Sequence, residues 1–468
     1  TFDGNTLTAG SGNDTITLDG ASFGDSANGF PDNDINLGGG TNLLTVTSDG
    51  KFDNNKLSTD AGDDTIDITA IQFNDNVVNL GNGDNVFDLK SNTGSLNNND
   101  FTGGNDADDV SFTAAGVDSS TFNLGGGSNI FDLTASSDIN NIDYTGGSLD
   151  DTLTISGQKL SNNTIGVGSD NNTIDITGSG DIDTNTLTAG SDNDVLTMES
   201  DGIINNDVNL SSGNNTMTFT SNDRFNDNNI TGGSDQDDVT LEGTTSSISG
   251  NTFSFGSGTN TFDQTNSGAT FNSTVTTGSG VDTITIAGAL SDTTFNLGQS
   301  ADMLTIREFG NTNDINMGTQ SNVADKLALT NSGAHDLRSP SGSGFSLTGV
   351  EEIDLGDADI QDLQVNRDTI NQADDIGGSN RLLIRGNNDD NVDFEFSTGS
   401  FNTAGTADIN GVTFDIFEHD NGTIGKLFVQ DGITVTENGG PVTFDALNST
   451  RDGTVSSEEI PDWREITD

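Results

Sequence analysis

The sequence predicts an all-β protein: a right-handed parallel β-helix (a β-solenoid) of about 21–22 residues per coil, followed by a smaller β-rich C-terminal module. Three observations lead to this prediction. The pattern in 8-TAGSGNDTITL-18 recurs every 20 to 23 residues after a first step of 28, and a looser form of it continues through Asp325 to Glu351. Within each repeat, apolar and polar residues alternate with the period of two that is typical of a strand. Gly, Asn, Asp and Ser occupy the positions between these alternating segments, and these residues favour turns.

Each repeat has an Asp or Asn before its alternating aliphatic residues, and we call this residue the anchor. Ile16 and Leu18 follow the anchor Asp14 at the second and fourth positions. Another apolar residue, such as Phe52, lies about ten residues after an anchor, and one such as Ile35 lies seven before the next. Each repeat therefore predicts three short strands with these side chains inside. The anchors are Asp14, Asn42, Asp64, Asn85, Asp108, Asn129, Asp151, Asn172, Asp194, Asn215, Asp237, Asn260, Asp282, Asp302, Asp325 and Glu351.

The anchors alternate between Asp and Asn as far as Asp282. Five positions before the anchor, Asn repeats carry a large apolar residue such as Leu124, whereas most Asp repeats carry a small one such as Gly103 or Gly146. Large residues stacked over small ones predict interdigitated packing between coils. The alternation also separates the carboxylates, since two of them about 5 Å apart repel by roughly 3 kcal/mol at an effective dielectric of 20. The repeating unit is therefore a pair of coils.

The composition excludes several classes of partner and site. The chain has 468 residues, with 74 Asp and Glu against 14 Lys and Arg, for a net charge of −60. Such a chain repels nucleic acid and anionic membranes and attracts cations. The sequence has no Cys, which excludes disulfides, thiolate metal sites and Cys nucleophiles. No apolar run approaches the length of a transmembrane helix, so we expect no membrane insertion.

Several repeats resemble a known calcium-binding motif. The segment 9-AGSGNDTIT-17 is similar to the nonapeptide G-G-x-G-x-D-x-U-x of secreted RTX-type (hemolysin-type calcium-binding repeat) proteins, and so are 146-GGSLDDTLT-154 and 232-GGSDQDDVT-240. The resemblance implies Ca²⁺ held between neighbouring coils. A calcium-free ladder of polar turn residues is the alternative, because alternate coils offer Asn, a weaker ligand than carboxylate. The candidate ligands at the matching positions are Asp14, Asp64, Asp108, Asp151, Asp194, Asp237 and Asp282.

Residues 347–440 form the second predicted region. They run from LTGVEEIDL through SNRLLIRG to INGVTFDIFEHDNGTIGKLFVQDGITVT. This stretch resembles a module found near the C-terminus of giant bacterial surface adhesins and other RTX-type secreted proteins. The resemblance implies a strand, a short helix over about residues 361–373, and further strands. It also implies secretion to the cell surface or the medium.

Residues 441–468 form the third predicted region, an EF-hand-like tail. The segment 444-FDALNSTRDGTVSSEEI-460 resembles one half of an EF-hand or dockerin-type pair, with Gly453 at the sharp turn. Asn and Thr replace the usual acids at the first and third loop positions, so calcium affinity should be reduced. A capped helical turn without metal is the alternative. The candidate ligands are Asn448, Thr450, Asp452, Thr454, Ser456 and Glu459.

An enzyme and an ice-binding protein are the competing hypotheses. Some parallel β-helices cleave polysaccharides, but the bases Lys51, Lys56, Lys90, Lys159 and Arg224 are scattered along the first 300 residues. The regular acids single out no catalytic pair, and no GxSxG, HExxH or P-loop motif occurs. Rows of outward Thr, as at Thr15 and Thr17, are typical of ice-binding surfaces, but Asp67, Asp88, Asp132 and Asp175 interrupt them. We therefore predict a protein without enzymatic activity.

The prediction is an extracellular structural protein: an acidic, calcium-responsive solenoid over residues 1–346 that assembles head-to-tail into surface or matrix fibres. The sequence begins within a coil, so we expect either that the natural chain extends further upstream or that this uncapped end docks onto the C-terminal part of another copy. A cell-surface polysaccharide is a second candidate partner, as in a biofilm matrix. The alternative role is the stalk or ligand-binding section of a giant bacterial adhesin.

Overall fold

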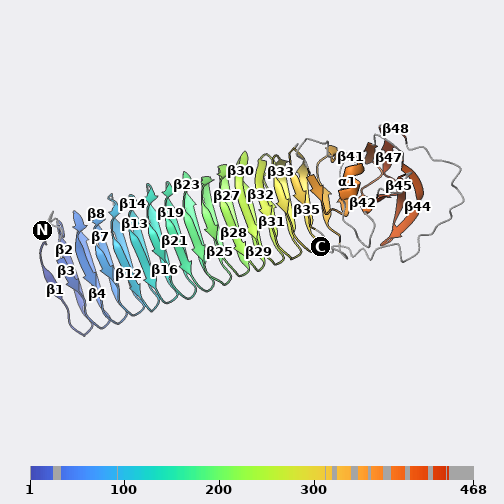
Figure 1. Ribbon diagram of the computed structural model, residues 1–468. Coiled ribbons are helices and arrows are strands. Elements are labelled where there is room, and N and C mark those ends of the chain that lie inside the picture. The colour runs from blue at the N-terminus through green and yellow to red at the C-terminus, as the bar shows by residue number, and fades with distance from the viewer. Residues whose placement is uncertain are drawn as a thin grey trace. The chain divides into compact units, whose positions relative to one another are not determined.

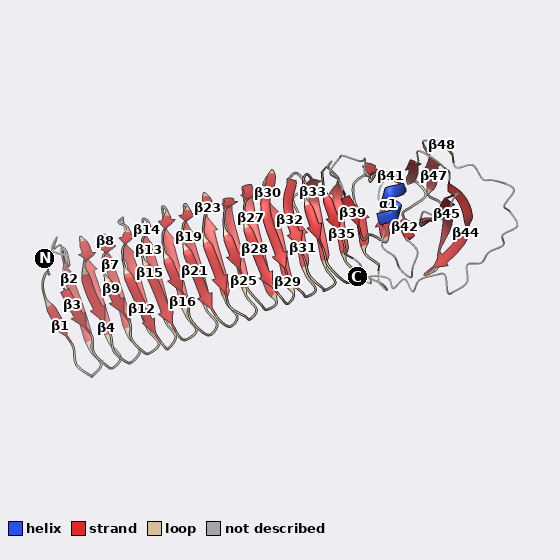
Figure 2. Ribbon diagram, viewed as in Figure 1, coloured by secondary structure: helices blue, strands red, loops and turns tan. Residues whose placement is uncertain are grey.

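The computed structural model describes residues 2–24, 33–91, 93–310, 312–318, 324–338, 346–356, 360–372, 381–395, 401–419, 425–438 and 440–441. The protein is all-β, and its parallel strands stack as the coils of a β-solenoid (Figure 1), as the sequence predicts. One short helix, α1 (Arg367–Gln372), is present among the described residues (Figure 2). The chain divides into two compact units, Thr1–Gly233 and Ser234–Asp468.

Each coil of the first unit contributes strands to three faces. The strands that follow the anchors are β2 (Thr15–Gly20), β4 (Leu43–Ser48), β7 (Thr65–Ala70), β10 (Val86–Ser91), β13 (Asp109–Ala114), β16 (Ile130–Ala135), β19 (Thr152–Gly157), β22 (Thr173–Gly178), β25 (Val195–Ile204) and β27 (Asn215–Asn226). β25 and β27 continue into the second face, whose other strands are β5 (Lys51–Asp53), β8 (Gln72–Asn74), β11 (Leu96–Asn97), β14 (Val117–Asp118), β17 (Ile139–Asn140), β20 (Leu160–Ser161) and β23 (Asp181–Asp183). The third face has β1 (Thr6–Thr8), β3 (Asn33–Asn36), β6 (Asn55–Ser58), β9 (Val77–Asn79), β12 (Asp100–Gly104), β15 (Thr121–Gly125), β18 (Asp143–Thr145), β21 (Thr164–Gly168), β24 (Thr186–Ala189), β26 (Asp207–Asn209) and β28 (Asn229–Gly233).

Neighbouring coils pair in parallel and in register. Phe131 in β16 pairs with Val110 of the preceding coil and Leu153 of the following one. Equivalent residues therefore stand in columns with one coil, about 4.8 Å, between them. In such an array every repeat uses its neighbours as partners, so a local sequence pattern becomes a continuous surface or core.

The apolar columns predicted from the repeat form the core. The inward residues of β16, Phe131 and Leu133, are fully buried. Ile130, which points outward from the same strand, is 49% exposed. Phenylalanine rings stack along the coil axis, with centroids 5.9 Å apart for Phe23 and Phe52 and 5.4 Å apart for Phe52 and Phe73. Offset rings at these distances contribute stabilisation beyond the burial of their area.

The second unit continues the same design. The strands that follow anchors, or pair with such strands, are β29 (Asp237–Gly243), β31 (Thr261–Gln264), β33 (Thr283–Leu290), β35 (Met303–Glu308), β37 (Lys326–Leu329), β40 (Glu352–Asp354), β42 (Arg381–Arg385) and β46 (Lys426–Gln430). A further row contains β30 (Ser247–Phe255), β32 (Thr270–Thr276), β34 (Thr294–Asn296), β36 (Asp314–Asn316) and β39 (Ser346–Thr348). A separate small sheet contains β38 (Gly333–Asp336), β41 (Gln361–Asn366), β43 (Asn391–Glu395), β47 (Thr434–Glu437) and β48 (Gly440–Pro441).

Antiparallel strands end both sheets of the second unit. β46 pairs in parallel with β42 on one side and antiparallel with β45 (Val412–His419) on the other. β45 also pairs with β44 (Phe401–Ile409), and β48 pairs antiparallel with β47. Phe414 and Ile416 of the hairpin β44–β45 share a buried cluster with Leu383 and Phe428, whose strands belong to the coils. The hairpin therefore covers an outer face of the last coils with apolar side chains.

The helix predicted over about residues 361–373 is shorter than expected. Residues Gln361–Asn366 form β41, because they pair in parallel with β43 and bury Leu363 and Val365. The helix begins only at Arg367. Asn366 caps it, since its side-chain Oδ1 accepts a hydrogen bond from the Thr369 backbone N–H at 3.1 Å. The alternating pattern of residues 361–366 thus specifies a strand.

Replacing Phe131 with Ala should destabilise the coil around it by about 3–5 kcal/mol, because it leaves a cavity in a fully buried column. Hydrogen exchange of the amides in β13, β16 and β19 measures this local loss. Ile130→Ala is the matched control on the same strand, and its outward side chain should change protection by less than about 0.5 kcal/mol. Equal losses in both variants would contradict the assigned inward and outward faces.

Candidate functional site

The anchors form a hydrogen-bonded ladder along the turn that precedes the first strand of each coil. Each anchor's backbone N–H donates to Oδ1 of the anchor in the following coil. The N···O distances are 3.1 Å from Asp64 to Asn85, 3.2 Å from Asn85 to Asp108 and 3.0 Å from Asp108 to Asn129. Within the second unit the same bonds link Asp237 to Asn260 at 3.0 Å. The side-chain oxygen therefore takes over the backbone pairing at the turn.

The predicted ligand residues are buried members of this ladder rather than exposed turn residues. Asp14, in the first coil, is half-buried. The carboxyl groups of the first unit lie two coils apart with an Asn anchor between them. The other six candidate ligands are all at most 2% exposed: Asp64, Asp108, Asp151, Asp194, Asp237 and Asp282.

Asn and Asp anchors differ in how they use their second side-chain atom. Asn85 Nδ2 donates to the carbonyl of Gly83 two residues earlier at 2.8 Å, and Asn42 Nδ2 donates to Gly40 O at 3.1 Å. The matching atom in an Asp anchor is an acceptor. Oδ2 of Asp151 and of Asp194 is buried and has no hydrogen-bond partner. An Asn anchor thus satisfies its whole side chain, whereas ionised Asp151 and Asp194 do not. Asp108 differs, because its Oδ2 accepts a hydrogen bond from the Gly104 backbone N–H at 3.3 Å.

The small residue five positions before an Asp anchor makes room for that second oxygen. A Cβ added at Gly146 would lie 2.4 Å from both Asp151 Oδ2 and Val167 O. At Gly103 it would lie 2.4 Å from both Asp108 Oδ2 and a backbone carbonyl of the next coil. A side chain at either glycine would collide with the carboxyl group, whereas Thr59 and Thr277 at the matching positions hydrogen-bond to Asp64 and Asp282. The alternation of small and large residues therefore follows from the position of Oδ2, in addition to packing between coils.

Burial of these carboxyl groups controls their protonation. Burial raises the pKa of Asp108 to about 6, against hydrogen bonds from Asn85 that lower it. Burial likewise raises the pKa of Asp151 to about 6, with hydrogen bonds from Asn129 opposing the shift. In each case the charged form loses hydration on burial, so the neutral acid is favoured.

Acidic anchors follow one another without Asn at the end of the second unit's ladder. Asp282 N donates to Asp302 Oδ1 at 2.9 Å, and Asp302 N donates to Asp325 Oδ1 at 2.8 Å. Asp325 N donates to Glu351 Oε2 at 2.6 Å. Burial, with the neighbouring charges of Asp325 and Asp282, raises the pKa of Asp302 to about 9. Asp302 therefore keeps its proton at neutral pH.

The anchors alone do not supply a complete calcium shell. Calcium takes six to eight oxygen ligands. Each Asp anchor of the first unit has one oxygen committed to a backbone N–H, and the nearest acidic anchor is two coils away. Within the described residues, no group of three or more His, Asp or Glu side chains lies close enough to hold a metal ion. Calcium at the solenoid turns, as the resemblance implies, stays a prediction.

The EF-hand-like ligands lie outside the described residues. These are Asn448, Thr450, Asp452, Thr454, Ser456 and Glu459.

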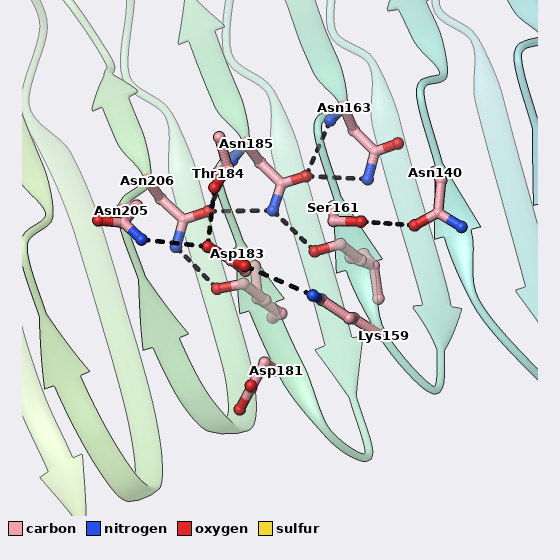
Figure 3. A network of polar contacts seen from close by, with 12 residues as sticks. Asn140, Lys159, Ser161, Asn163, Asp181, Asp183, Thr184, Asn185, Asn205 and Asn206 are labelled. Carbon is pink, nitrogen blue, oxygen red and sulfur yellow. Dashed lines mark hydrogen bonds and ion pairs between the residues drawn. The ribbon is translucent and has the colours of Figure 1, made fainter.

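A second buried ladder, of asparagines, was not predicted from the sequence. Asn163 N donates to Asn185 Oδ1 at 3.0 Å, and Asn185 N donates to Asn206 Oδ1 at 3.0 Å (Figure 3). Asn185 Nδ2 also donates to Leu160 O of the preceding coil, so this one side chain joins two coils. The signal was present: each such Asn lies two residues before the third strand's buried aliphatic, as Asn185 does before Leu187. Its other members include Asn33, Asn55, Asn76 and Asn99.

The residues before Asn163, Asn185 and Asn206 turn the chain through the left-handed region. Asn162 and Asn205 have φ values of 56° and 54°. Asn and Asp adopt this conformation more readily than other non-glycine residues. An outer ion pair flanks the corner, with Lys159 Nζ 3.4 Å from Asp183 Oδ2 (Figure 3). Although partial burial opposes it, hydrogen bonds from Thr184 and Asn205 and the charge of Lys159 lower the pKa of Asp183.

Comparison with protein-family models, with curated proteins and with solved structures found no match for this chain. The function must therefore be argued from the geometry. Of the part of the chain that the structure describes, no helix is long and apolar enough to cross a membrane.

The stability of the first unit should fall as the pH rises from about 4 to about 7. The folded pKa of Asp108 and of Asp151 is about 6, above the ordinary value of 3.8, so folding binds these protons more tightly. Their contribution is fully present below about pH 4 and is lost as the pH passes 6, and each can amount to about 3 kcal/mol. Hydrogen exchange of the adjacent coils at several pH values measures this loss.

Asp108→Asn combined with Asp151→Asn should flatten that pH dependence, because the amides do not titrate. Asp143→Asn, at an exposed position of β18, is the control and should leave it unchanged. A double variant with the pH profile of the original chain would show that other groups control the stability.

Proposed function

We propose that this chain is an extracellular structural protein, a stiff acidic β-solenoid that joins other copies of itself into fibres at the cell surface or in a matrix. The ladders of buried Asn and Asp carry the proposal. They bond each coil to the next at two turns of the cross-section, in addition to the strand pairing. A repeat stabilised by its neighbours suits a load-bearing or spacing role, since stability grows with stacking.

The first coil offers a surface for joining. Among the described strands, β1 pairs only with β3, and β2 pairs only with β4. In the proposed fibre, a strand of another copy pairs with the alternate backbone groups on the other side of β1 and β2. A copy that pairs there makes a heterologous contact, and heterologous contacts that do not close produce filaments. In the proposed fibre, this edge meets the C-terminal unit of a neighbouring copy, whose outer strand is β44.

One observation favours a second function. The antiparallel strands β45 and β48 occupy the pairing edges of β46 and β47. They end the parallel stacking in the way a terminal capping element does. A solenoid capped at this end suits the stalk of a large surface adhesin, which spaces another part of the protein away from the cell. A cell-surface polysaccharide is the proposed partner in either role.

Electron microscopy of the purified chain should show regular fibres whose length grows with concentration. Leu43 N donates to Asp14 O, so Thr15 and Thr17 of β2 direct their backbone groups to the open edge. Thr17→Pro should abolish fibres, because proline cannot donate at that edge. Thr17→Ala is the control, since it keeps the N–H. Isolated particles of the unaltered chain at every concentration would favour the stalk.

We also propose that calcium stiffens the protein, on the strength of the RTX and EF-hand resemblances. Calorimetric titration of the EGTA-treated chain with Ca²⁺ should show uptake and a higher unfolding temperature. Asp108→Asn with Asp151→Asn should reduce the uptake if the solenoid turns bind the ion. Glu459→Gln tests the C-terminal loop separately. A chain whose melting is the same in EGTA and in Ca²⁺ would remove calcium from the proposal.

A further inference from the structure

The outer surface of the first unit has a groove at the corner that follows strands β16, β19 and β22. Its volume is about 490 Å³, within the range of small-ligand sites. Small residues make the hollow: Gly157 and Gly178 stand in register and carry no side chain. The lining comes from five consecutive coils, from Ser136 to Asn222, a length of about 19 Å at the coil spacing.

The groove presents polar groups to solvent. Gln158, Ser179, Glu199 and Asp201 are all exposed lining residues. Among the residues that line it, Ala135 supplies the single aliphatic side chain. Such a wall contributes hydroxyl, amide and carboxylate groups in place of an apolar surface, so it favours a ligand rich in hydrogen-bonding groups.

The two carboxylates of the groove lack the partners that other surface acids have. Asp181 is ion-paired with Arg224 at 2.9 Å, and Asp183 is paired with Lys159 at 3.4 Å. In the described part of the chain, the side chains of Glu199 and Asp201 form no ion pair and no hydrogen bond. No Lys or Arg is among the lining residues. The groove therefore attracts a cation and repels an anion.

The polar groups also repeat along the coil axis. Ser156, Thr177 and Glu199 occupy one in-register column. A ligand that fits such a column is itself linear, with donors at a regular spacing. Hydroxyl groups of sugar rings meet the Ser, Gln and Asn side chains, and protonated amines meet the carboxylates through charge-assisted hydrogen bonds.

We propose that this groove binds an amino-sugar oligosaccharide, a linear chain of hexoses that carry protonated amino groups. Glu199 and Asp201 hold the ammonium groups, and Gln158 and Ser179 hold ring hydroxyls. The site is independent of fibre formation. It gives the solenoid a specific contact with a cationic polysaccharide, whereas its net charge alone gives only diffuse attraction.

Calorimetric titration with a glucosamine hexamer in mildly acidic buffer tests the proposal. Glu199→Gln with Asp201→Asn should weaken binding at least about 10-fold, because the charge-assisted hydrogen bonds to the ammonium groups are lost. Ser179→Trp, which fills the groove and keeps the charge, should weaken it as well. Asp132→Asn with Asp175→Asn is the matched control, since it removes two exposed charges from β16 and β22 at positions that do not line the groove.

Three comparisons would overturn the proposal. The first is the absence of binding by the glucosamine hexamer to the intact chain. The second is an equal loss in the control variant, which would reduce the interaction to general charge attraction. The third is equally tight binding of an N-acetylglucosamine hexamer or an oligogalacturonate. Unchanged hydrogen-exchange protection of β19, β22 and β25 in each variant shows that the coils remain folded.

Discussion

The hydrogen bond from an anchor's backbone N–H to the side-chain oxygen in the next coil is the constraint on which the solenoid depends. A turn interrupts strand pairing, and a buried N–H without a partner costs about 1–3 kcal/mol. The ladder supplies that partner in coil after coil, at 3.1 Å from Asp64 to Asn85 and 3.0 Å from Asp151 to Asn172. The ladder therefore requires a side-chain oxygen within reach of this N–H, which Asn and Asp provide in most coils and Glu351 provides for Asp325.

The choice between Asn and Asp determines the electrostatics of the interior. An Asn anchor closes both of its hydrogen bonds, whereas the second oxygen of Asp151 is left buried opposite a carbonyl. Because Asn anchors lie in the coils on either side, such a carboxyl group has no other anchor carboxylate next to it and avoids direct charge repulsion from one. Where acids follow one another, as at Asp282, Asp302 and Asp325, burial and then the charges of the neighbouring acids raise the pKa of Asp302. A proton bound to the carboxyl group offsets the cost of burial and of this repulsion.

The surface is organised differently from the interior. Most charges project from the corners, where pairs such as Lys159 and Asp183 are half-solvated and contribute little to stability. The groove near Glu199 is distinct because its acids lack such partners and small residues hollow the wall beside them. An in-register array converts one favourable contact into a row of contacts, so recognition by a solenoid is suited to linear ligands.

The sequence by itself determined the coil length, the strand positions and the inward residues, because period and alternation are local properties. It predicted the anchors correctly as one column. Which side the anchor side chain faces was decided by tertiary structure: the missing backbone partner at the turn draws Asp108 and Asn129 inward. The second ladder, the strand at Gln361–Asn366 and the groove beside Gly178 likewise depend on what the neighbouring coil places opposite each residue. A single repeat does not contain that information, since it exists only after the coils have stacked.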